Sequence, residues 1–222
     1  MNVNDFKAPE QLPEDTLIAI FKHQHDLAGK YLDIEEANGL LQTRDIPVNI
    51  HDKLGQARIK DEFWRVTEEV CEALEALDEE DLPHFHEELA DAMHFFVEAC
   101  VLSNFMEFGV EIHNGNKDTL YNLFWESHEV QPQFEEQVNP FYIHRKAMCF
   151  IKELGLAANC LKNKPWKQSH VHTDEAKYRN IMSKAFRRFI DLCKASGFSW
   201  DGLYNMYMCK YEVNKFRQNS GY

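Results

Sequence analysis

Long segments of the chain carry apolar residues at intervals of three and four, which is the spacing of one face of an α-helix. Phe63, Val66, Val70, Leu74 and Leu77 show this spacing in a stretch without glycine or proline. The whole sequence of 222 residues holds only 9 glycines and 7 prolines, too few for the many turns of an all-β fold. We therefore predict an all-α protein, a helical bundle of about six helices.

The periodic segments place these helices along the chain. They cover residues 15–31, 51–77, 84–108, 141–161, 174–195 and 200–216. Residues 109–140 are the least regular part, and we interpret them as an insertion with one short helix near 121–125. No internal repeat or low-complexity tract divides the sequence, so a single domain is expected for residues 1–222.

Composition limits the cellular setting. The six cysteines include no Cys-x-x-Cys pair, and most lie among apolar residues, so reduced thiols are expected. No apolar run approaches the roughly 20 residues that cross a bilayer, and residues 1–11 lack a signal-peptide pattern. We expect a cytoplasmic protein with no membrane partner.

Charge divides the sequence into two parts. Residues 141–222 hold 15 Lys and Arg against 6 Asp and Glu, a net of +9, which leaves 9 against 31 for residues 1–140, a net of −22. One interpretation is that solvated helix faces differ; another is that acidic helices hold cations and a basic segment binds an anion. The net charge of −13 disfavours a nucleic acid as partner.

Four carboxylates on two consecutive helices are the candidate metal site. Glu69 and Glu72 are three residues apart, as are Glu88 and Asp91, so each pair projects from one helix face. Both pairs lie at matching distances from the break near residue 80, so an antiparallel hairpin would bring them level. A cluster of carboxylates repels itself unless a cation is present, and oxygen ligands suit a hard ion such as Mg²⁺.

Two other interpretations of this region compete with magnesium. Acidic pairs on neighbouring helices also arise by chance as solvated charges. His86-Glu87 begins like a zinc-protease motif, but Ala90 occupies the position of the second histidine, so zinc is excluded.

The basic end of the chain is the second candidate site. Lys210, Asn214 and Arg217 fall at i, i+4 and i+7, which lines them along one helix face. Such a row of donors suits a polyphosphate, although a solvated helix end would show the same spacing.

Together these motifs resemble the all-α nucleoside triphosphate pyrophosphatase superfamily, which includes dimeric dUTPases and MazG-type enzymes. The pattern Glu-x-x-Glu followed by Glu-x-x-Asp is one part of the resemblance. The ending Lys-x-x-x-Asn-x-x-Arg-Gln-x-x-Gly-Tyr is the more specific part, and it is similar to the last motif of dimeric dUTPases and of phage dCTP/dUTP pyrophosphatases.

This resemblance implies a Mg²⁺-dependent hydrolysis of a deoxynucleoside triphosphate, most simply dUTP, to the monophosphate and pyrophosphate. It implies magnesium ligands at Glu69, Glu72, Glu88 and Asp91, with Glu72 also activating the attacking water as the catalytic residue. It implies substrate contacts from Gln24, Lys210, Asn214, Arg217 and Tyr222. It also implies a homodimer, located in the host cytoplasm if a phage encodes it.

One position departs from the family pattern. The dUTPases carry a Gln and, four residues later, an Asn near the base; here Gln24 fits the first position, but Ala28 occupies the second. A pyrophosphatase for dCTP or, as in MazG-like enzymes, for other nucleotides therefore stays an alternative to a dUTPase. A non-catalytic helical interaction protein is the third.

Overall fold

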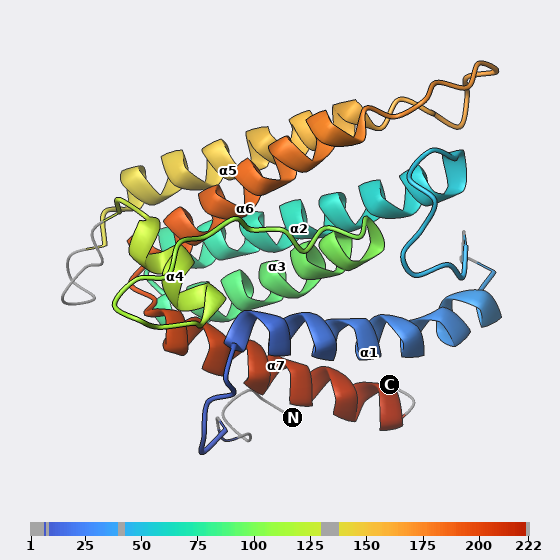
Figure 1. Cartoon of the computed structure of the whole chain (residues 1–222). Coiled ribbons are helices and arrows are strands. Elements are labelled where there is room, and N and C mark those ends of the chain that lie inside the picture. The colour runs from blue at the N-terminus through green and yellow to red at the C-terminus, as the bar shows by residue number, and fades with distance from the viewer. Residues whose placement is uncertain (1–6, 8, 40–42, 130–137, 221–222) are drawn as a thin grey trace.

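The computed structural model describes residues 7, 9–39, 43–129 and 138–220, and the regular elements within them are all helices (Figure 1). The helices are α1 (Thr16–Ala37), α2 (Lys53–Asp78), α3 (Leu82–Leu102), α4 (Thr119–Glu126), α5 (Pro140–Cys160), α6 (Glu175–Ala195) and α7 (Trp200–Ser220). The predicted all-α class is confirmed. The seventh helix is α4, which forms where the sequence predicted a short one.

Helices α2 and α3 form an antiparallel hairpin at the centre of the bundle. The turn between them is tight: the Asp81 amide donates to the Ala76 carbonyl (2.9 Å), and Glu80 adopts a left-handed φ of 63°. The Asp81 side chain then caps α3 by accepting from the His84 amide (3.1 Å). This turn fixes which residues of the two helices stand level with each other.

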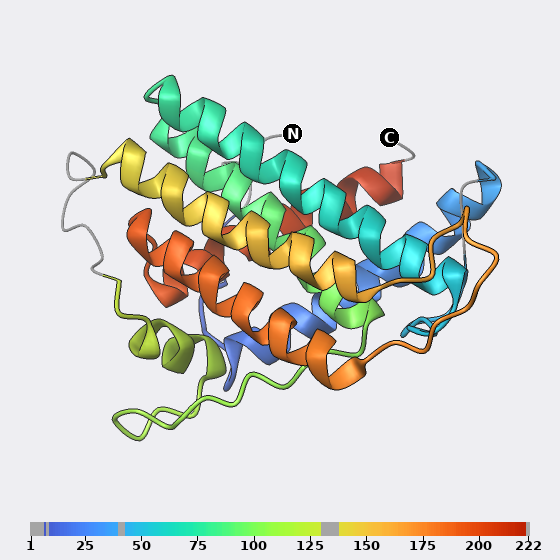
Figure 2. The same cartoon turned by 90° about the horizontal axis from the view of Figure 1, so that it is seen from above.

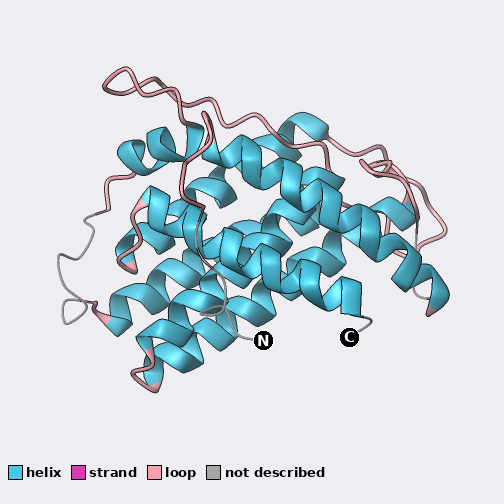
Figure 3. Cartoon of the chain, turned by 90° about the horizontal axis from the view of Figure 1, so that it is seen from below, coloured by secondary structure: helices cyan, strands magenta, loops and turns pink. Residues whose placement is uncertain are grey.

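The remaining helices cover the hairpin on two sides. Helices α5 and α6 pair with each other, and α5 packs on α2; α1 and α7 pack on α3 and on each other (Figures 1 and 2). Helix α4 contacts α1, α6 and α7, and the loops lie at the periphery (Figure 3). No helix among the described residues is long and apolar enough to span a bilayer.

Helix α3 lies in the middle of the core. Its buried residues point in every direction, and Phe96 contacts Phe150 on α5 and both Phe186 and Phe189 on α6. Because α3 has neighbours all around, any polar side chain on its inner turns must find its partners inside the protein.

Two predicted helix ends were wrong by six residues each, and α7 continues to Ser220, four residues past its predicted end. Helix α1 continues to Ala37 rather than residue 31, and stops where Gly39 takes a left-handed φ of 70°. Helix α3 ends at Leu102 rather than residue 108, because Asn104 turns left-handed (φ 52°). Phe105 still reaches the core after this turn.

All six cysteines are free thiols. Cys100, Cys160 and Cys193 are buried as expected, whereas Cys71 is exposed. Burial raises the pKa of Cys100 and Cys193, so these two thiols are structural and unreactive.

Candidate metal centre on the hairpin

The hairpin brings three of the four predicted metal ligands together. Glu69 on α2 and both Glu88 and Asp91 on α3 each offer a carboxylate oxygen, and these oxygens lie within 4.8 Å of one another. The symmetry of the sequence about residue 80 thus translates into proximity across the hairpin.

Glu72 stands beside this cluster and outside it. Its side chain is exposed one turn from Glu69 on the same helix. Its charge is close enough to help raise the pKa of Glu69. Among the described residues, the cluster of mutually close ligand atoms does not include it.

The cluster strongly favours positive charge. Burial, a hydrogen bond to Glu88 and repulsion from Asp91, Glu88 and Glu72 raise the pKa of Glu69 to about 8. Burial also raises the pKa of Asp91 to about 6, although Lys210 opposes this shift. Near neutral pH these carboxyls therefore hold a proton part of the time, in place of a cation.

The ligand atoms fit a hard divalent cation. They are all carboxylate oxygens, and they come from two rigid helices rather than a loop. An oxygen-only set is the kind that Mg²⁺ or Mn²⁺ prefers. No cysteine or histidine belongs to this cluster within the described residues.

The ammonium group of Lys210 on helix α7 lies against the acidic cluster. Lys210 is only 5% exposed, and its Nζ contacts Glu87 Oε1 (2.8 Å) and Asp91 Oδ2. Asn214 and Arg217 follow on the same helix, half-buried and exposed respectively. Arg217 acts electrostatically on Tyr31 of α1. Tyr222 lies outside the described residues.

Gln24 is an interior residue rather than a solvated one. It is 3% exposed on α1, and its Nε2 donates to Glu98 Oε2 at 2.9 Å. Its Oε1 accepts from the Tyr207 hydroxyl at 2.8 Å and lies 2.9 Å from His94 Nδ1. The His94 ring stacks on Tyr207. Gln24 thus links α1 to α3 and α7 behind the acidic cluster.

A second pair of acids on the hairpin escaped the sequence analysis. Glu62 and Glu98 are 2% and 6% exposed, and they lie seven residues beyond Glu69 and Asp91, again at matching distances from residue 80. Burial raises the pKa of both, and Glu98 adds repulsion that raises the pKa of Glu62 further. The same symmetry argument would have found them.

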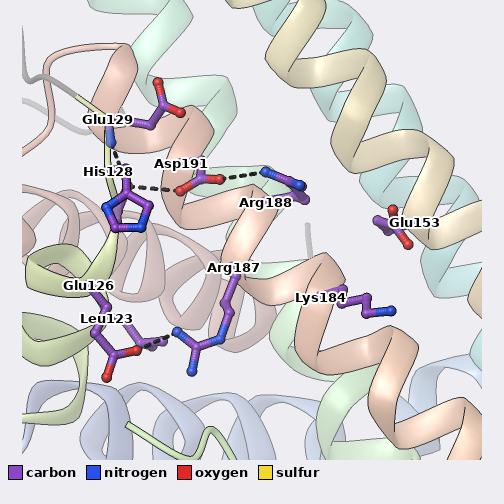
Figure 4. Close-up of a pocket in the computed structure, with 10 residues that line it drawn as sticks. Leu123, Glu126, His128, Glu129, Glu153, Lys184, Arg187, Arg188 and Asp191 are labelled. Atoms are coloured by element: carbon purple, nitrogen blue, oxygen red, sulfur yellow. Dashed lines mark hydrogen bonds and ion pairs between the residues drawn. The ribbon is translucent and has the colours of Figure 1, made fainter. Parts of the chain in front are cut away.

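A cavity elsewhere in the bundle does not compete with this site. It measures about 420 Å³ and lies between α4, α5 and α6 (Figure 4). Most of its charged side chains already pair with each other, as Glu126 does with Arg187 and Arg188 with Asp191 (3.1 Å). It lacks the cluster of unneutralised acids that marks the hairpin.

Comparison with known proteins decides the family: residues 75–222 match the dUTPase family. The chain belongs to the dUTPase family. This confirms the resemblance to the all-α nucleoside triphosphate pyrophosphatases, and it points to a dUTP-diphosphatase-like hydrolase with a nucleotide substrate. No curated protein and no solved structure matches the chain.

The matched range holds only part of the site of this dUTPase-family chain. It includes Glu88 and Asp91 on α3 and the basic residues of α7. Glu69, Glu72 and Gln24 precede it. The contribution of Glu69 therefore rests on the geometry of the hairpin, and that of Gln24 on its hydrogen bonds to α3 and α7, rather than on the match.

Proposed function

We propose that this protein hydrolyses dUTP to dUMP and pyrophosphate in a Mg²⁺-dependent reaction. The observation that carries the proposal is the oxygen cluster of Glu69, Glu88 and Asp91 with Lys210 at its edge. A triphosphate brings negative charge that only cations can neutralise. A site with spare carboxylates and a neighbouring ammonium group supplies both metal ligands and a direct phosphate partner.

In this proposal Glu69, Glu72, Glu88 and Asp91 hold the magnesium. When bound, Mg²⁺ neutralises the phosphates, polarises phosphorus and lowers the pKa of water. The exposure of Glu72 suits a group that also contacts the attacking water, because its carboxylate is open to solvent. Glu72 would orient this water and accept its proton as general base.

The phosphate chain would lie along α7. Lys210, Asn214 and Arg217 occupy one side of this helix, and we include Tyr222 beyond its end. Lys210 already stands against Asp91, so it would bridge the acidic helix and a phosphate oxygen. Asn214 and Arg217 would contact phosphates farther from the hairpin.

The base is assigned to the neighbourhood of Gln24. A dCTP pyrophosphatase is the second candidate, and it is favoured by one observation: Ala28, which replaces the asparagine of dUTPases, is fully buried. No amide is therefore available at that position to read the pyrimidine. We also propose that the protein is a homodimer, which light scattering on the purified protein would test. We propose a cytoplasmic location as well.

The test is pyrophosphate release from a complete panel of ribo- and deoxynucleoside triphosphates, with and without Mg²⁺. We expect dUTP to be cleaved fastest and only with the metal. Faster cleavage of dCTP would replace the first candidate by the second. If no nucleotide in the panel releases pyrophosphate, both enzyme candidates are refuted and the non-catalytic interaction protein is the remaining interpretation.

A further inference from the structure

The hydrogen bonds of Gln24 leave it little freedom. Its carboxamide oxygen is approached by the Tyr207 hydroxyl and His94 Nδ1, and its Nε2 donates to Glu98. An amide has two N–H donors, so one N–H remains. In this orientation Gln24 can offer a ligand a donor and no acceptor.

Two neighbours compete for the orientation of this amide. A carboxylate only accepts hydrogen bonds, so ionised Glu98 requires Nε2 on its side. His94 favours the reverse. Its Nε2 faces the Tyr207 carbonyl at 3.2 Å, and burial lowers the His94 pKa to about 3. A neutral imidazole ring has one N–H. If Nε2 carries this hydrogen and donates it to the Tyr207 carbonyl, Nδ1 becomes an acceptor, and it then requires an N–H from the Gln24 amide.

Tyr207 can satisfy either orientation. Its hydroxyl donates to Gln24 Oε1, but the Ile20 carbonyl lies within 3.3 Å as an alternative acceptor. If the amide turned over, the hydroxyl would donate to Ile20 and accept from Gln24. The carboxylate of Glu98 is therefore the group that decides the orientation. Burial raises the pKa of Glu98, and Arg58 and Arg65 on α2 oppose this shift in favour of the ionised form.

We propose that Glu98 is a specificity-determining positioning residue that holds the Gln24 amide with its spare N–H available to the pyrimidine. A donor pairs with O4 of uracil and opposes the N4 amino group of cytosine, which is itself a donor. Glu98 would thus favour dUTP over dCTP without touching either. This inference rests on the proposed function and adds the residue that sets its base preference.

The test compares kcat/KM for dUTP and dCTP in wild type and Glu98→Gln. The glutamine can donate to Gln24 Oε1, so the amide turns over to suit His94 and offers an acceptor. We expect the dUTP-to-dCTP ratio to fall about tenfold, the scale of one hydrogen bond. Glu98→Asp keeps an acceptor-only group and should retain the ratio.

Glu153→Gln on α5 is the matched control, because Glu153 is also a buried glutamate (8% exposed) and forms an ion pair with the neighbouring Lys152 (3.0 Å). Its ratio should equal that of wild type. A ratio in Glu98→Gln within twofold of wild type, with both substrates slowed alike, would show a merely structural role. A wild-type preference for dCTP would overturn the assignment of the donor.

A measurement on the wild type covers the case in which Glu98→Gln does not fold. Protonated Glu98 can donate, so the ratio should fall toward acid pH, above the range where cytosine itself protonates. The groups facing Glu98 are Gln24, Tyr31 and Glu35 on α1, Arg58, Glu62 and Arg65 on α2, and Tyr207 on α7. Effects of pH on the metal site change kcat/KM for dUTP and dCTP alike and therefore cancel in the ratio of the two. A ratio constant with pH would overturn the inference, whereas inactivity toward both nucleotides would refute the proposed function instead.

Discussion

Replacing Lys210 with methionine tests whether α7 compensates the charge of the acidic hairpin. Methionine retains most of the apolar stem but removes the ammonium group that contacts Glu87 and Asp91. Loss of one partner of a buried ion pair usually costs ~3–5 kcal/mol, because it leaves a charge uncompensated. Here Asp91 can escape that cost by taking up a proton.

The pKa of Asp91 sets the size of the effect. With a pKa of about 6 in the native protein, protonating Asp91 at about pH 7.5 costs ~2 kcal/mol, at ~1.4 kcal/mol for each pH unit. This cost of ~2 kcal/mol is the upper limit of the unfolding free energy that the substitution can lose by leaving Asp91 without its partner. At about pH 5.5 the group is already largely protonated, so the same substitution should cost almost nothing through it.

The assay is urea unfolding of wild type and Lys210→Met at both pH values, with and without saturating Mg²⁺. We expect the loss at the higher pH to shrink when Mg²⁺ is added, because the metal takes over the neutralisation of Asp91. Lys194→Met is the control, since the Lys194 Nζ donates to the Phe124 and Ser127 carbonyls (2.8 and 2.9 Å). Its cost should depend neither on pH nor on Mg²⁺. If the loss of unfolding free energy in Lys210→Met were also the same at both pH values and with or without Mg²⁺, the reasoning would be refuted.

Two further predictions concern the same cluster. Glu72→Gln should lower kcat for dUTP by at least about a hundredfold, as expected when a general base is lost, while the melting temperature stays unchanged because Glu72 is exposed; near-normal turnover would place the chemistry elsewhere. The metal-free protein should lose stability as pH rises from about 4 to 8, because the pKa values of Glu69 and Asp91 are raised above their ordinary values to about 8 and 6. Melting temperatures should show this decline and its reversal by Mg²⁺ at the alkaline end; a metal-free protein most stable at pH 8 would contradict it.

The hairpin site was predictable because its geometry follows from counting. Two helices joined by a short turn bring residues at equal distances from that turn to the same level of the hairpin, but not always onto facing sides: Glu72, level with Glu88, is exposed and lies outside the cluster. Glu69 and Asp91, eleven residues from residue 80 on either side, meet for this reason. The rule needs only that both helices be regular, and α2 and α3 run unbroken through these positions.

The partners of buried polar residues could not be predicted in the same way. On α1 the buried face contains Leu17, Phe21, Gln24 and Ala28, whereas Ile18 is 45% exposed. Hydropathy alone favours an apolar side chain such as Ile18 over Gln24 for a buried position, because it does not reveal that a glutamine has partners inside. Those partners, Glu98 and Tyr207, come from α3 and α7, and only the packing of three helices brings them together.

Direct measurement of Mn²⁺ binding tests the central claim, with Mn²⁺ standing in for Mg²⁺ and free ion detected by electron paramagnetic resonance. Wild type should remove Mn²⁺ from solution, whereas Asp91→Asn and Glu69→Gln should bind it at least about tenfold more weakly while staying folded. If both variants bind Mn²⁺ as tightly as wild type does, these carboxylates do not form the metal centre.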